Sequence, residues 1–336
     1  MSIVPGENRA LLVLLAAAIS ACGAGSGGSS LDRADAAIDA GADALAADGG
    51  ANDSDASNGS APGAGGDTDS GCPDGRGDGD GGCLPPTIRR PFLVGASLRA
   101  AGSSERDDWS LASVESAPHG LDARTARLLA DTWLKDALEE HASIAAFARF
   151  TMHLLSVGAP PELLLMAQRA GIDEIAHARA CFALAARYGG KRRGPSPLRV
   201  HDAMPALGLA HIAELAAEEG CVGETLGAVL AREQLAVVTD ASARKVLHKI
   251  AADEVRHAEL SWRFVSWAVR NGDRTVAASV RRGIERAVRG TLAAAERRYD
   301  VDHTAWRAHG RLTCRASKDV ARRAIDEVVM PCAQRL

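Results

Sequence analysis

Apolar residues recur at three- and four-residue spacing along the chain from about Leu121 onward. Leu134, Leu138, Ala142 and Ala145 follow this spacing and would share one face of a helix. The same region is dominated by Ala, Leu, Arg and Glu, which favour helices, and it contains few strand formers. The pattern predicts an all-α fold with four long helices, over residues 123–155, 161–188, 204–234 and 241–271.

Residues 23 to about 86 show no apolar periodicity. Residues 30–83 contain twelve Asp, two Arg and no Glu, among many Gly, Ala and Ser. A segment of this composition buries too little apolar surface to offset its chain entropy. We therefore expect a disordered tether, which we extend over residues 23–118.

The first 22 residues have the pattern of an export signal. A polar start is followed by an apolar run from Leu11 to Ile19 and by small residues up to Cys22. The run is too short to span a bilayer. The stretch Ile19-Ser20-Ala21-Cys22 resembles a bacterial lipobox, which implies a lipid anchor at Cys22 and an extracytoplasmic protein. Since Gly23 follows, the resemblance points to the outer membrane; an ordinary cleaved signal is the alternative.

Two more helices are expected after the four long ones, from Gly272 to about Arg298 and from about Ser317 to Val329. The chain thus divides into a signal segment over 1–22, a tether over 23–118, a helical domain over 119–272 and additional C-terminal helices over 273–336.

Charge and cysteine content narrow the possible partners and the compartment. The Arg excess after residue 84 forms no basic stripe interleaved with aromatics, so no nucleic-acid partner is expected. If Cys22 is lipidated, six cysteines remain, which is compatible with disulfides in an oxidising compartment. Cys72 with Cys83 is the first candidate pair, and Cys314 with Cys332 is the second.

An internal repeat carries the candidate chemistry. Residues 139–150 align with 218–229, and residues 173–182 align with 253–262. Each copy contains a single Glu followed by an Asp-Glu-x-x-His segment, whose Glu and His project from one helix face. The repeat supplies four carboxylates and two imidazoles as candidate metal ligands: Glu140, Glu174, His177, Glu219, Glu254 and His257.

The spacing within each copy predicts a helical hairpin with its carboxylates at one height. The midpoint between Glu140 and Glu174 is residue 157, within a turn that contains Gly158 and two prolines. The midpoint between Glu219 and Glu254 falls near residues 236 and 237, within a segment interpreted as the second turn, residues 233–240.

This inventory resembles the ferritin-like superfamily, which includes ferritins, rubrerythrins and di-iron monooxygenases. The resemblance covers about residues 121–271 and implies a four-helix bundle with two iron ions, or manganese instead. It implies that Glu174 and Glu254 bridge the metals, that Glu140 and Glu219 are terminal ligands, and that His177 and His257 bind one metal each.

The Asp before each Glu-x-x-His segment is a candidate hydrogen-bond partner for a metal-binding His. In di-iron monooxygenases, which the motif also resembles, the Asp of one helix binds the His of the other. The resemblance therefore pairs Asp173 with His257 and Asp253 with His177. Glu224 has no counterpart in the first copy and is interpreted either as an extra ligand or substrate contact or as a helix-surface residue.

The resemblance implies a membrane-tethered di-iron oxidoreductase acting on oxygen or peroxide. Two alternatives stay open at this point: a surface lipoprotein that sequesters iron without turnover, and a structural lipoprotein with a degenerate metal site. Neither a substrate nor a redox partner can be assigned from the residues.

Overall fold

The computed structural model describes residues 13, 16, 89–95, 97–110, 118, 120–294 and 304–336. The chain divides into two compact units, residues 1–23 with 79–336 and residues 24–78, and the second unit lies wholly outside the described residues. The predicted lipid-attachment residue Cys22 and the predicted pair Cys72–Cys83 also lie outside them.

The described part of the chain is mostly helical. The long helices are α2 (Ala123–Ser156), α3 (Pro161–Gly189) and α6 (Ala241–Asn271), whereas a fourth long stretch consists of α4 (Leu209–Leu215), the π-helix η4 (Ala216–Val222) and α5 (Gly223–Val237). The C-terminal elements are α7 (Arg274–Ala294), α8 (Thr304–Ala308), α9 (Cys314–Ala324), η5 (Ile325–Val329) and α10 (Met330–Ala333).

Local sequence signals explain the ends of these helices. The Asp122 side chain caps α2 by accepting hydrogen bonds from the backbone N–H groups of Arg124 and Thr125, at 3.0 and 2.9 Å. Gly158 then takes a left-handed conformation (φ 66°), and Pro161 begins α3. Asp240 caps α6 through the N–H of Ala243 at 2.9 Å. Predicted and observed boundaries therefore agree closely for α2, α3 and α6.

The predicted helix over 204–234 differs from what the structure contains. It begins five residues later, runs to Val237 and includes the π-helix η4 in its middle. A π-helical turn holds more residues than an α-helical turn, so it rotates the side chains that follow it relative to a regular helix.

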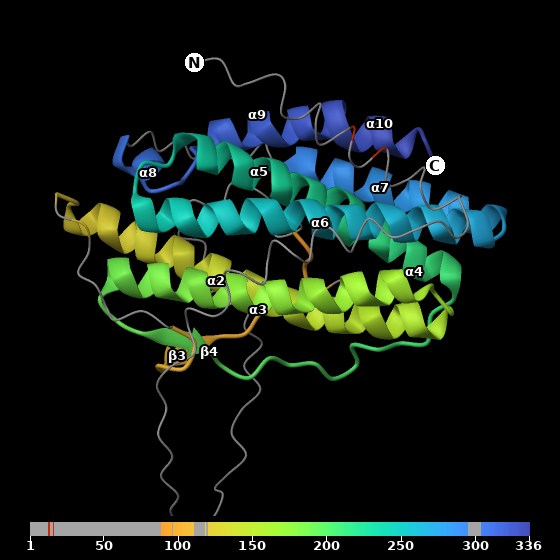
Figure 1. Cartoon of the computed structure of the whole chain (residues 1–336), viewed down its shortest axis with the longest axis horizontal. Helices are drawn as coiled ribbons and strands as arrows, with labels where there is room; N and C mark the ends of the chain where they lie inside the picture. Colours follow the sequence, from red (N-terminus) through yellow and green to blue (C-terminus); the bar gives the residue numbers. More distant parts are fainter. Residues whose placement is uncertain are drawn as a thin grey trace, which may run out of the picture. The chain divides into compact units, whose positions relative to one another are not determined.

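The helices pack as two antiparallel hairpins, α2 with α3 and α5 with α6, and α3 lies against α6 (Figure 1). The connection from α3 to α4 runs along the length of the helices, so α3 and α5 point the same way (Figure 1). Helix α7 covers α4 and η4, and α9 packs on α5. None of the helices in the described ranges is long and apolar enough to cross a membrane.

Residues 89–110 correct the predicted extent of the tether. The described part of this segment contains β1 (Leu93–Val94), β2 (Ser97–Leu98) and β3 (Ser103–Glu105), and β3 pairs antiparallel with β4 (Arg193–Pro195). Arg90 and Phe92 are only 1% exposed. The segment's polar composition suggested disorder, but its buried residues contact α2, η4 and α6, which sequence periodicity does not reveal.

The predicted disulfide between Cys314 and Cys332 is wrong. Cys314 is disulfide-bonded, whereas Cys332 is free and fully buried, as are Cys181 and Cys221 among the described residues. Cys332 lies in the core cluster with Val328 and Val329, where a small apolar side chain is needed for packing.

Candidate metal centre

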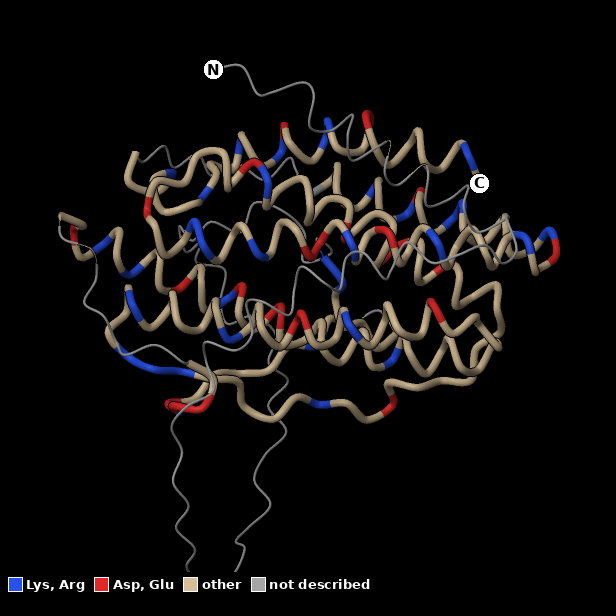
Figure 2. The backbone as a smooth tube through the Cα atoms, viewed as in Figure 1, with Lys and Arg blue, Asp and Glu red and all other residues tan. Residues whose placement is uncertain are grey.

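Two overlapping groups of acidic and histidine side chains lie midway along the helices. In the first group, one ligand atom each from Glu140 of α2, Glu174 and His177 of α3 and Glu254 of α6 lie within 4.8 Å of one another. In the second group, Glu254 is joined within the same limit by Glu224 of α5 and His257 of α6. Figure 2 shows acidic positions gathered at this level of the helices. All six side chains are at most 2% exposed.

The inward-facing polar atoms of this centre lack hydrogen-bond partners. Buried polar atoms are normally satisfied, and a buried carboxylate without a cation is costly. Among the described residues, seven such atoms belong to the six side chains: Glu140 Oε2, Glu174 Oε2, His177 Nδ1, Glu224 Oε2, both carboxylate oxygens of Glu254, and His257 Nδ1. Oxygen and imidazole nitrogen donors that converge in this way fit metal ions.

His257 of the second group also lies against Glu174 of the first. His177 Nδ1 lies 3.8 Å from both Glu140 Oε2 and Glu174 Oε2. His257 Nδ1 lies 3.1 Å from Glu174 Oε1 and 3.7 Å from Glu254 Oε2. Glu174 therefore faces both imidazoles, and Glu254 belongs to both groups.

The aspartates lie behind the histidines, in the pairing that the resemblance implied. His177 Nε2 is 2.7 Å from Asp253 Oδ2, and His257 Nε2 is 3.4 Å from Asp173 Oδ2. Arg256 binds both aspartates, at 2.7 and 2.9 Å, and Lys249 binds Asp253 at 2.8 Å. An outer nitrogen held by a carboxylate fixes the ring and leaves Nδ1 free to bind a metal.

The structure separates Glu219 from the other five predicted ligands and brings Glu224 to the centre instead. Glu219 accepts hydrogen bonds from Arg149 Nη2 at 2.9 and 3.1 Å, and it belongs to neither ligand group. The π-helix η4 contains Glu219 and changes the register of the stretch. The position of the turn could have indicated Glu224 from the sequence. The turn lies between Val237, where α5 ends, and Ala241, where α6 begins. Residue 239, in the middle of this turn, is also the midpoint between Glu224 and Glu254, so these two glutamates lie at the same height.

Two consecutive arginines, neither predicted from the sequence, reach the centre. Arg89 donates a hydrogen bond from Nη1 to Glu140 Oε1, and its Nε lies 3.7 Å from Glu254 Oε1. Arg90 donates from Nε to Glu224 Oε1 at 3.3 Å. The sequence signal was a pair of basic residues a short distance after the Asp-rich region, whose last Asp is residue 80.

Burial and neighbouring charges shift the pKa values of these groups strongly. Burial and the nearby Glu140 raise the pKa of Glu174 to about 7. Burial also opposes ionisation of Glu140, but Arg89 and His177 outweigh it and lower the pKa to about 2. Burial lowers the pKa of His177, yet the hydrogen bond to Asp253 and the nearby carboxylates of Glu140 and Glu174 raise it well above its ordinary value. Without a metal, the centre therefore holds protons at neutral pH.

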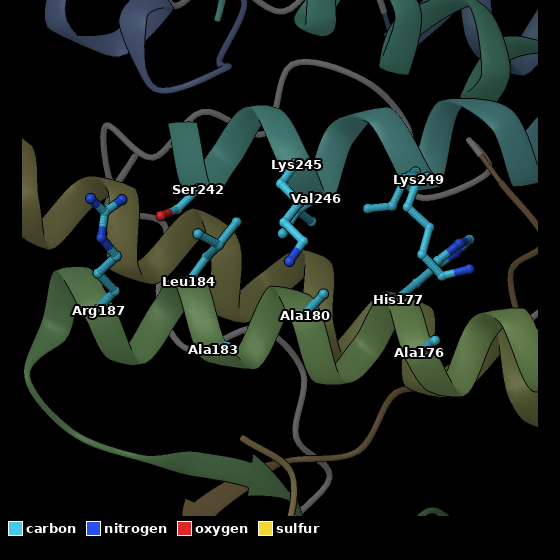
Figure 3. A pocket seen from close by; sticks show the side chains of 11 residues that line it. Ala176, His177, Ala180, Ala183, Leu184, Arg187, Ser242, Lys245, Val246 and Lys249 are labelled. Atoms are coloured by element: carbon cyan, nitrogen blue, oxygen red, sulfur yellow. The ribbon is translucent and has the colours of Figure 1, made fainter. Parts of the chain in front are cut away.

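An apolar groove runs between α3 and α6 and ends beside the centre. Its volume is about 380 Å³, and Figure 3 shows its side chains, with Arg187 near one end and His177 at the other. Leu184, Val246 and Ile250 line it, and Lys249 lies at the His177 end. Of the six residues in the two ligand groups, His177 lines this groove.

Comparison with protein-family models, curated proteins and solved structures finds no match to this chain. The chain is thus described by its own features. It is a mostly helical protein with a buried cluster of glutamates and histidines that could hold metal.

Proposed function

We propose that the chain is a ferritin-like di-metal protein whose helical hairpins α2–α3 and α5–α6 form the four-helix bundle. The observation that carries the proposal is the convergence of seven buried, unpartnered oxygen and nitrogen atoms from four helices. The proposed ligands of two iron ions, or of manganese, are Glu140, Glu174, His177, Glu224, Glu254 and His257.

The positions of the side chains support separate roles for these ligands. Glu254, which belongs to both groups, and Glu174, which faces both imidazoles, would bridge the ions. Glu140 and Glu224 would each bind one ion through Oε2, because Oε1 of each is already held by an arginine. Carboxylate oxygens with imidazole nitrogen suit iron or manganese better than a thiolate-preferring ion.

The proposed activity is an oxidoreductase reaction with oxygen or peroxide. Bound iron would supply the redox and Lewis-acid chemistry that such a reaction needs. The chain's own residues would bury the centre and orient the imidazoles through Asp253 and Asp173. The groove beside His177 would admit the small oxidant.

The proposed location is outside the cytoplasm, on a lipid anchor at Cys22 in the bacterial outer membrane. The lipobox-like stretch before Cys22 and the Asp-rich region after it support this location. The disulfide at Cys314 fits an oxidising compartment. Radiolabelled palmitate incorporated by the wild type and lost in Cys22→Ser is the direct test of the anchor.

The test of the metal centre is the metal content of the purified full-length protein after growth with iron. We expect bound iron or manganese, lost in a Glu174→Gln, Glu254→Gln double variant. Glu218→Gln is the control, because Glu218 is a glutamate of η4 that pairs with Arg286 on α7 and belongs to neither ligand group. No metal in the wild type would overturn the proposal and leave a structural protein.

Peroxide and oxygen consumption by the loaded protein then tests the reaction. Turnover that the double variant lacks supports the oxidoreductase. A loaded protein that consumes neither oxidant is instead a metal-sequestering protein, which is the second function compatible with this ligand set.

A further inference from the structure

The buried centre contains two guanidinium groups beside its carboxylates, and they offset part of its negative charge. Four glutamates belong to the two ligand groups, and Arg89 and Arg90 contact three of them. The two aspartates behind the histidines have their own cations, Lys249 and Arg256. With neutral imidazoles, the centre is left with two uncompensated negative charges, which match one divalent ion.

Arg90 is a fixed part of this arrangement. It is 1% exposed, donates from Nη2 to Ser261 Oγ at 2.7 Å, and lies over the rings of Phe147 and Phe150 at 4.6 and 4.5 Å. A Cβ at residue 220 would come within 2.4 Å of Arg90 Nη2, so Gly220 provides the space for its guanidinium. Arg90 cannot leave without rebuilding the core around it.

Arg89 is held less firmly and lies nearer to solvent. Its side chain is 13% exposed and makes one hydrogen bond, to Glu140, with Glu254 a little farther away. Its backbone N–H donates to the carbonyl of Gly223 at 2.9 Å, and its φ of 72° lies in the left-handed region that disfavours residues with a side chain. Arg89 is therefore the less firmly held of the two arginines.

We propose that Arg89 is an internal cation that occupies the Glu140–Glu254 side of the centre and controls how many metal ions it holds. With Arg89 in place, the protein takes one divalent ion, on the side of Glu224, Glu254 and His257. A second ion binds at Glu140, Glu174 and His177 when the guanidinium leaves, since like charges at close range in a buried site repel strongly. This inference rests on the proposed metal-binding function. It assigns control of the number of bound ions to Arg89, which acts as a positioning residue for Glu140.

The test compares Mn²⁺ binding to the metal-free full-length protein, by calorimetry and by metal analysis, in four forms. These are the wild type, Arg89→Gln, Arg89→Lys and the control Arg106→Gln. Arg106 lies in the same segment and pairs with Asp108 instead of a glutamate of the centre. Arg89→Met, which keeps the aliphatic stem without the charge, replaces Arg89→Gln if the Gln variant does not fold.

The expected result is about one tightly bound Mn²⁺ in the wild type, Arg89→Lys and Arg106→Gln. Arg89→Gln is expected to bind a second ion at least about tenfold more tightly than the wild type does. Two ions bound with equal affinities in the wild type and Arg89→Gln would overturn the role of Arg89 and leave the metal centre standing. No Mn²⁺ in any form would overturn the metal centre itself.

Discussion

The two helical hairpins contribute equal numbers of candidate metal ligands but differ in regularity. In the first hairpin, α2 and α3 are uninterrupted helices joined by a short turn at Gly158. In the second, the π-helix η4 interrupts the stretch before α6. The first hairpin therefore presents its single glutamate from a regular helix, whereas the second presents Glu224 just after a π-helical turn.

This difference also gives Glu219 a structural role. Glu219 lies within η4 and pairs with Arg149 of α2, which links the second hairpin to the first. Arg149 also donates to the carbonyl of Leu93 and lies over the ring of Phe92. A glutamate that matches the repeat by residue type thus helps to hold the two hairpins and the 89–94 segment together.

The largest expected effect separates the two Glu-x-x-His glutamates. Glu254 belongs to both ligand groups and Glu174 to one, so Glu254→Gln should weaken the binding of both ions. We expect more than a 100-fold loss of Mn²⁺ affinity, beyond the roughly 10- to 100-fold cost of losing a supporting partner. Glu174→Gln should cost less at the ion on the side of Glu224, Glu254 and His257, because Glu174 does not belong to that group. Calorimetric titration of the two variants with Mn²⁺ measures these losses. Equal losses of affinity would contradict the prediction that Glu254 serves both ions and Glu174 mainly one.

The next comparison sets Glu224 against Glu219. Glu224→Gln should remove one ion and also destabilise the protein, because the buried Arg90 charge loses its carboxylate partner. Glu219→Gln should keep the metal and destabilise the protein by about 3–5 kcal/mol, since the buried Arg149 charge loses its partner. Metal analysis distinguishes the two, and urea unfolding measures the destabilisation. Loss of metal in Glu219→Gln alone would restore the register expected from the repeat.

A smaller effect should separate the two aspartates. Asp253 lies 2.7 Å from His177 Nε2, whereas Asp173 lies 3.4 Å from His257 Nε2. Asp253→Asn should therefore lower the Mn²⁺ affinity toward the upper end of about 10- to 100-fold, and Asp173→Asn toward the lower end. The reverse order in a titration would show that these distances do not govern imidazole orientation.

The smallest expected effect is the pH dependence of metal binding. The pKa of Glu174 is raised to about 7 by burial and by Glu140, so below this pH a metal ion must displace its proton. The pKa of His177 is raised as well, despite burial, because Asp253 and Glu140 favour the protonated ring. Affinity should therefore rise with pH, about tenfold per unit for each proton displaced. Titrations at pH 6, 7 and 8 measure it, and a flat profile would contradict proton displacement.

Sequence reasoning was accurate where a feature depends on local spacing. Asp122, Gly158 and Asp240 mark helix ends, and the observed boundaries of α2, α3 and α6 follow them. The three-residue step from Glu174 to His177 and from Glu254 to His257 places each pair on one helix face. These are short-range relations, which any helix with this sequence would satisfy.

Sequence reasoning failed where a feature depends on packing between distant segments. The change from Glu219 to Glu224 arises from a π-helix, and residue spacing does not reveal whether a helix contains a π-turn. The entry of Arg89 and Arg90 depends on space beside Gly220 and on carboxylates from three helices. The segment that contains Arg89 and Arg90 follows a polar, glycine-rich region and has no apolar periodicity that would indicate the burial of these two side chains.

The sequence by itself determined that the chain is helical, where its main helices begin and end, and that two Asp-Glu-x-x-His segments can face each other. Capping, turn geometry and helical periodicity are local, so they are encoded in neighbouring residues. The tertiary structure decided which glutamates converge, which pair with arginine, and what net charge the centre carries. Those outcomes depend on burial and on distances between residues far apart in the chain, where the cost of an unpaired charge selects the partners.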